Sequence, residues 1–117
     1  MRSNSTVEAS ALSSSFGRIT IASDVVAEIV AHVTAEAYGI VDMSGGPLSR
    51  LRGRRGIDIG RDGDAVTIDL RVVVECGLNL AEVASTLRNR VTYEVERLTG
   101  LRVSTVEVHI DDVRRSA

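Results

Sequence analysis

The chain has 117 residues, with 14 basic and 16 acidic side chains, a formal net charge of −2 and one cysteine. This length predicts a single domain, and the slight acidity argues against a surface that binds nucleic acid generally. A lone cysteine excludes an internal disulfide framework and fits a reducing compartment.

The N-terminal residues 1–15 are rich in serine and lack the continuous apolar core of a signal peptide. They are predicted to form a disordered tail. No later segment approaches the ~18 consecutive apolar residues that are needed to span a bilayer. We therefore expect a cytoplasmic protein without a transmembrane segment, in which residues 16–113 form one domain and residues 114–117 a polar end.

The first half of this domain carries short or interrupted patterns. Residues 18–21 predict a short strand, and Ser23 is a candidate N-cap for a helix that ends at Gly39. The periodicity fails over 42–55, which predicts a loop rich in glycine and arginine. A second strand is predicted over 57–59, and a turn then leads into its hairpin partner.

That partner, over 65–75, has the clearest strand pattern in the chain. Its alternate apolar residues are Val66, Ile68, Leu70, Val72 and Val74. Such alternation predicts one face on a core and the other largely in water. Asn79 and Glu82 then match the start of a helix, with Asn79 as the cap, and Gly100 is placed to end it.

A fourth strand is predicted over 106–110, followed by a frayed polar end from Asp111 onward. The expected order is therefore strand, helix, strand, strand, helix, strand. Two helices on one face of a four-stranded mixed or antiparallel sheet give a two-layer α+β sandwich. The second face of the sheet is left in contact with water.

Nine landmarks follow one another along the chain: Gly17–Ile21, Val25–Val30, Tyr38–Val41, Arg55–Ile57, Val72–Gly77, Leu80–Ala84, Val91, Leu98–Leu101 and Val106–Ile110. In this order and spacing they resemble the alkaline shock protein family, the Gls-type general-stress proteins of Gram-positive bacteria. The resemblance implies a small cytoplasmic protein that is linked to envelope stress. It also implies self-association, or attachment beneath the membrane through an integral partner protein, and it transfers no catalytic residue.

The loop at 42–55 contains the only concentrated charge, in Arg50, Arg52, Arg54 and Arg55. These arginines are candidates for binding the phosphates of RNA or of anionic lipid. The alternative is a solvated loop whose arginines pair with nearby carboxylates such as Asp58 and Asp62.

The water-facing side of the predicted sheet is the second candidate site. It carries Arg18, Thr20, Thr67, Asp69, Arg71, Val73, Glu75, Thr105, Glu107 and His109. These residues suit an interaction face, because charged pairs set the choice of partner. Cross-strand pairing within an exposed sheet explains the same residues equally well. An exposed Val73 in the middle of the face favours an interface.

No residue spacing typical of catalysis or metal binding is present in the sequence. His32, His109 and Cys76 lie on separate predicted elements, whereas a thiol nucleophile needs a base within hydrogen-bond reach. Cys76 is expected to be a small buried apolar residue. We therefore expect no catalytic residue, metal or cofactor.

The first hypothesis is a non-enzymatic adaptor or scaffold of the envelope stress response. It would act by self-association or by binding a membrane-anchored protein partner, without a small-molecule substrate. The alternative is phosphate-directed binding of RNA or anionic lipid through the arginine-rich loop.

Overall fold

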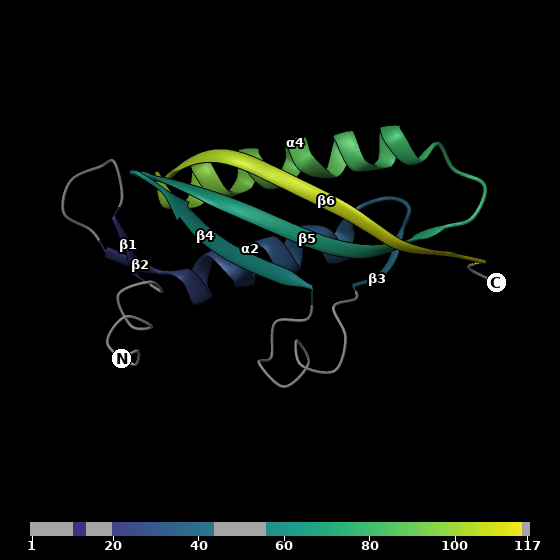
Figure 1. Cartoon of the computed structure of the whole chain (residues 1–117), viewed down its shortest axis with the longest axis horizontal. Coiled ribbons are helices and arrows are strands. Elements are labelled where there is room, and N and C mark those ends of the chain that lie inside the picture. The colour runs from purple at the N-terminus through teal and green to yellow at the C-terminus, as the bar shows by residue number, and fades with distance from the viewer. Residues whose placement is uncertain (1–10, 14–19, 44–55, 116–117) are drawn as a thin grey trace.

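The computed structural model describes residues 11–13, 20–43 and 56–115. The described elements are β1 (Ala11–Ser13), β2 (Thr20–Ala22), α2 (Ser23–Glu36), β3 (Ile40–Met43), β4 (Ile57–Asp62), β5 (Ala65–Glu75), α4 (Leu80–Thr99) and β6 (Arg102–Arg114). Both helices lie on the same side of a four-stranded sheet (Figure 1). The predicted α+β class is confirmed.

The sheet is organised around β5, the long strand with the clearest sequence pattern. One edge of β5 pairs with β6 in parallel along its whole length, from Ala65 to Glu75. The other edge is shared by two antiparallel strands, β4 opposite residues 65–70 and β3 opposite residues 72–74. The sheet is therefore mixed. The parallel pair follows from the long helix α4, which returns the chain to the starting end of β5.

The core lies between the sheet and the helices, as the alternation in β5 predicts. Its members from β5 are the alternate residues Val66, Ile68, Leu70, Val72 and Val74, each no more than 1% exposed. Helix α4 packs Val83, Leu87 and Val91 into this core, and α2 contributes Val26 and Val30. Each fully buried side chain of this kind contributes about 1.5–3 kcal/mol by leaving water.

The two helices begin in different ways. The side chain of Asn79 accepts a hydrogen bond from the Glu82 backbone N–H at 3.1 Å, which confirms the predicted cap of α4. Gly100 ends that helix in the left-handed conformation, also as predicted. The prediction for Ser23 is wrong. Helix α2 starts at Ser23 itself, so Ala22 occupies the N-cap position and provides no side-chain acceptor.

Three strand predictions need correction. The first strand does not join the main sheet, because β2 pairs with β1 in a separate two-stranded sheet while both edges of β5 are already occupied. The fourth member of the main sheet is β3, which was not predicted as a strand. The frayed end predicted from Asp111 is also wrong, since β6 continues to Arg114. The Arg114 backbone carbonyl accepts a hydrogen bond from the Cys76 N–H at 2.7 Å.

Candidate functional site

The candidate site is the open face of the sheet, meaning the side that faces away from α2 and α4. The parallel register of β5 and β6 sets matching side chains next to one another there. Thr67 lies beside Thr105, Asp69 beside Glu107, and Arg71 beside His109. The residues of the predicted interaction face that the structure brings together are Thr67, Asp69, Arg71, Val73, Glu75, Thr105, Glu107 and His109.

Two residues of that prediction are not part of this arrangement. Thr20 belongs to β2, outside the main sheet, and Arg18 lies outside the described residues. The use of the remaining residues as an interaction surface stays a prediction.

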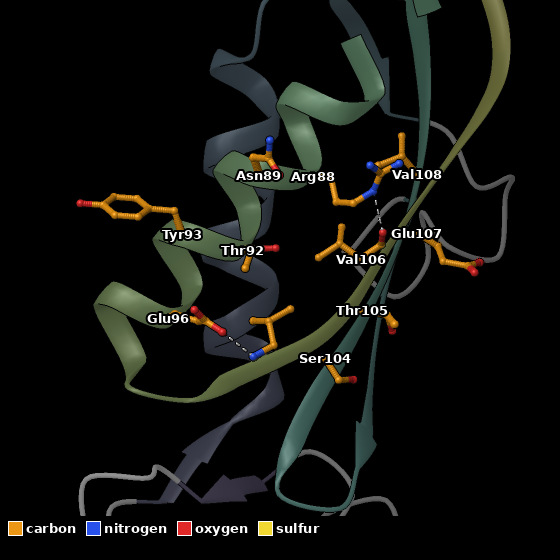
Figure 2. A pocket seen from close by; sticks show the side chains of 11 residues that line it. Arg88, Asn89, Thr92, Tyr93, Glu96, Ser104, Thr105, Val106, Glu107 and Val108 are labelled. Atoms are coloured by element: carbon orange, nitrogen blue, oxygen red, sulfur yellow. Dashed lines mark hydrogen bonds between the residues drawn. The ribbon is translucent and has the colours of Figure 1, made fainter. Parts of the chain in front are cut away.

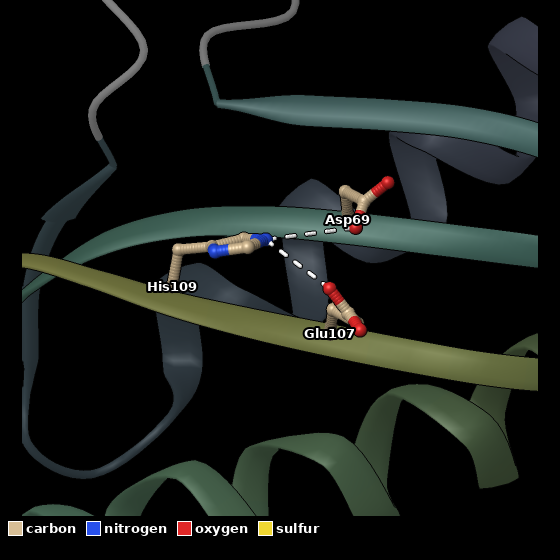
Figure 3. Close-up of side chains that lie close together, drawn as sticks. All are labelled: Asp69, Glu107 and His109. Carbon is tan, nitrogen blue, oxygen red and sulfur yellow. Dashed lines mark ion pairs between the residues drawn. The ribbon is translucent and has the colours of Figure 1, made fainter.

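His109 stands between two carboxylates near the middle of the open face (Figure 3). Its Nε2 atom lies 3.6 Å from Asp69 Oδ1 and 3.6 Å from Glu107 Oε1. Asp58 on β4 is the direct cross-strand partner of Asp69. Carboxylates of Asp58, Asp69 and Glu107 therefore form a row across β4, β5 and β6. Like charges that face each other across strands destabilise a sheet, so this row favours a neighbouring cation.

A second group of charges occupies the end of the open face where β5 finishes. Arg71 Nε donates to Asp111 Oδ2 at 3.1 Å. Arg114 lies 3.6 Å from Asp112 on its own strand and 3.8 Å from Asp42 on β3. The pair of Arg114 and Asp42 joins the two strands that flank β5, so it crosses over β5 on this face.

Val73 lies beneath this crossing, and the prediction that it is exposed is wrong. Its side chain is only 2% exposed, although it points away from the helices. Asp42 and Asp112 are its direct partners on the two neighbouring strands. Both aspartates form ion pairs with Arg114. The apolar contact point expected at Val73 is therefore absent from the surface.

The sequence prediction missed several acidic and basic residues of this face: Asp42, Asp58, Asp111, Asp112 and Arg114. The alternation of Asp58 with Ile57 and Ile59 was a sufficient signal for its orientation. Asp112 and Arg114 also alternate with Val113. That signal is hidden by a bulge between Ile110 and Asp112, where Asp111 is the extra residue.

A groove of about 830 Å³ runs between α4 and the outer edge of β6 (Figure 2). Side chains from α4 reach into the groove and form hydrogen bonds with backbone groups at the edge of β6. Arg88 Nε donates to the Val106 carbonyl at 3.2 Å, and Glu96 Oε2 accepts from the Val103 N–H at 2.9 Å. These contacts protect one end of an edge that would otherwise be open to another strand.

The other candidates of the sequence lie elsewhere. Arg50, Arg52, Arg54 and Arg55 fall outside the described residues, so phosphate binding through them stays a prediction. Cys76 is exposed in the turn that follows β5, which corrects the expectation that it is buried. His32 lies on α2, in the helical layer, and faces Glu36 at 3.3 Å. The structure does not bring His32 and His109 together.

The helical layer carries its own exposed charges. On α4, Arg97 donates to Glu94 at 2.7 Å, and this hydrogen bond together with the negative charge raises the pKa of the Arg97 guanidinium. Within the described part of the chain, neither helix combines the length and apolar character that a membrane crossing requires.

Comparison with known proteins places the chain in a family. It is 30% identical to the uncharacterized protein YloU of Bacillus subtilis (strain 168), over 88% of this chain and 93% of that protein. It is 22% identical to YqhY of the same organism, over 94% of this chain and 87% of that protein. The uncharacterized protein Spy1614 of Streptococcus pyogenes is also 22% identical, over 84% and 88% of the two chains. No solved structure shows a significant match.

The family match extends over residues 11–115 and includes all of the described residues. It confirms the resemblance seen in the order of the sequence landmarks. The chain belongs to the family of alkaline shock protein 23, which is described as having a cell envelope-related function.

Proposed function

We propose that this protein is a non-enzymatic cytoplasmic adaptor or scaffold of the envelope stress response. It binds further copies of itself or a membrane-anchored protein partner, and the open face of the sheet is the contact surface. The observation that carries the proposal is the two-sided character of the sheet. One side is sealed by two helices, whereas the other presents charged residues in a fixed register.

Two properties of the open face support this role. Its charges are of both signs, and ion pairs such as Arg71 with Asp111 hold them in place. A pre-ordered pattern of charges gives specificity at a small entropic cost. Among the described strands β6 pairs only with β5, so part of its other edge can pair with a strand of another chain.

Reversing one charge on the open face tests the proposal. Arg71→Glu places a carboxylate beside that of Asp111 and two positions from Asp69 on the same strand face, and we expect it to weaken self-association or partner binding at least about tenfold. Arg97→Glu is the matched control on α4, because the two arginine side chains are 51% and 52% exposed and each forms one ion pair. Analytical ultracentrifugation over a concentration series measures self-association, and crosslinking in intact cells detects a membrane-anchored partner.

The two variants separate an open-face contact from a general effect of charge. A loss of association with Arg71→Glu but not with Arg97→Glu supports the proposal. Equal losses of association in the two variants would mean that the contact surface is not the open face. A wild-type chain that stays monomeric at every concentration and crosslinks to no protein in cells would refute the adaptor role.

A further inference from the structure

We propose that Asp69, Glu107 and His109 form a binding site for one divalent transition-metal ion, with Zn²⁺ as the representative. The site lies on the open face of the sheet, and the inference stands independently of the adaptor role. Three observations carry it: the spacing of the donor atoms, the combination of donors, and the charge of the surrounding residues.

The spacing of the donor atoms matches ligands around an ion. The donor atoms of the three side chains all lie within 4.8 Å of one another, and both distances from His109 Nε2 are 3.6 Å. An N–H···O hydrogen bond measures about 2.7–3.2 Å, so these contacts are too long to be hydrogen bonds. Two ligands at about 2.1 Å from a tetrahedral zinc ion are roughly 3.4 Å apart. The side chains therefore need only small rotations to meet one ion.

The backbone holds the three residues without adjustment. Asp69 and Glu107 are direct partners in the parallel ladder, and His109 follows Glu107 by two positions on the same face. Strands β5 and β6 pair along the full length of β5. Because the three residues lie on paired strands, their backbone is already ordered. Metal binding should therefore cost mainly side-chain conformational entropy.

The combination of donors selects the class of metal. Imidazole nitrogen suits Zn²⁺ and related first-row ions, whereas Mg²⁺ and Ca²⁺ prefer sites built from oxygen alone. Three protein ligands leave a coordination position for water or for a ligand from a partner. The side chains of Asp69 and His109 are 49% and 43% exposed, so an ion can enter directly from solvent.

The surrounding charges also favour a cation. Asp58 lies next to Asp69 on β4, which adds a third carboxylate to the row. The neighbouring cation, Arg71, is paired with Asp111 at 3.1 Å. A dication would therefore relieve the repulsion among Asp58, Asp69 and Glu107.

The other histidine of the chain provides a matched control. His32 is exposed on α2 and has the single carboxylate of Glu36 at 3.3 Å. Glu28 lies one helical turn before His32, but Glu36 is the carboxylate in ion-pair contact with His32, whereas His109 contacts two. The exposed thiol of Cys76 is a competing zinc ligand, so the Cys76→Ser chain is measured alongside the wild type.

The experiment is a titration of the full chain with ZnCl₂, followed by calorimetry and by NMR of the two histidine rings. We expect one equivalent of Zn²⁺ per chain and a shift of the His109 ring signals, with the His32 signals unchanged. We expect each of three variants to lower the zinc affinity at least about tenfold: His109→Ala, Asp69→Asn and Glu107→Gln. Loss of a residue that only hydrogen-bonds a metal ligand already lowers metal affinity by that much. His32→Ala and Cys76→Ser should leave the affinity unchanged, and MgCl₂ should not shift the ring signals.

Several results would overturn the site. These are the absence of a stoichiometric zinc equivalent, equal losses in His109→Ala and His32→Ala, and loss of binding in Cys76→Ser. The substituted side chains are exposed, so circular dichroism should show each variant to be folded. Asp69→Asn and Glu107→Gln preserve side-chain shape and provide the test if His109→Ala alters the fold.

Discussion

Gly39 lies in the turn between α2 and β3, and two features of its surroundings exclude a side chain. Its φ of +88° lies in the left-handed region, which favours glycine. A Cβ atom there would lie 2.8 Å from Leu78 Cδ1 and 3.1 Å from Val83 Cγ2. The Leu78 tip can rotate away, but Val83 is packed in the core. This single position therefore links the start of β3 to the start of α4.

Replacing Gly39 with alanine should destabilise the protein through both features. We expect Gly39→Ala to lower the free energy of unfolding by about 1–2 kcal/mol for the backbone conformation, plus about 1 kcal/mol for crowding. Gly77→Ala is the control, because Gly77 has a φ of +97° but nothing within 4 Å of an added Cβ. Urea unfolding of both variants measures the difference. Equal losses would show that contact with Val83 contributes nothing.

Strand β5 and helix α4 were predictable because their signals are local. Strict alternation over 65–75 and an Asn79 cap with Glu82 in the first turn are read from neighbouring residues. Strand β3 has only four residues, and such a short segment shows no period. Its strand conformation depends on pairing with the end of β5, which is a contact between distant parts of the chain. The end of β6 was missed because the Asp111 bulge interrupts the alternation.

The different starts of the two helices give a prediction for each. Asn79→Ala removes the acceptor for the Glu82 N–H and should lower the free energy of unfolding by about 1 kcal/mol. Ala22 already has the extended backbone of an N-cap, with φ −68° and ψ 146°, but lacks an acceptor. Ala22→Ser should therefore raise the free energy of unfolding by about 0.5–1 kcal/mol. Thermal unfolding monitored by circular dichroism compares the two variants. If Ala22→Ser lowered the free energy of unfolding, Ala22 would not be the N-cap and α2 would start at another residue.

At the scale of the whole molecule, function depends on which strands are neighbours. The sequence predicts that Asp69, Glu107 and His109 all face water, but only the parallel pairing of β5 with β6 brings them together. Pairing also buries Val73, which alternation alone would place in solvent. The sequence therefore indicates the face of the sheet, whereas the arrangement of groups across it follows from strand order. This is why the grouping of Asp69, Glu107 and His109 could not be found from spacing along the chain.

Hydrogen exchange across the whole molecule should reveal this strand order. The amides of β5 lie between partners on both edges, so their exchange should require global unfolding. The sheet of β1 and β2 has only three paired positions and lies outside the main sheet, so its amides should exchange at least roughly a thousandfold faster. Mass spectrometry after timed labelling measures both. Equal protection would mean that β1 and β2 unfold together with the main sheet, and rapid exchange in β5 would contradict its central position. Because the open face is built on β5 and β6, slow exchange in β5 would also show that this face is a rigid surface.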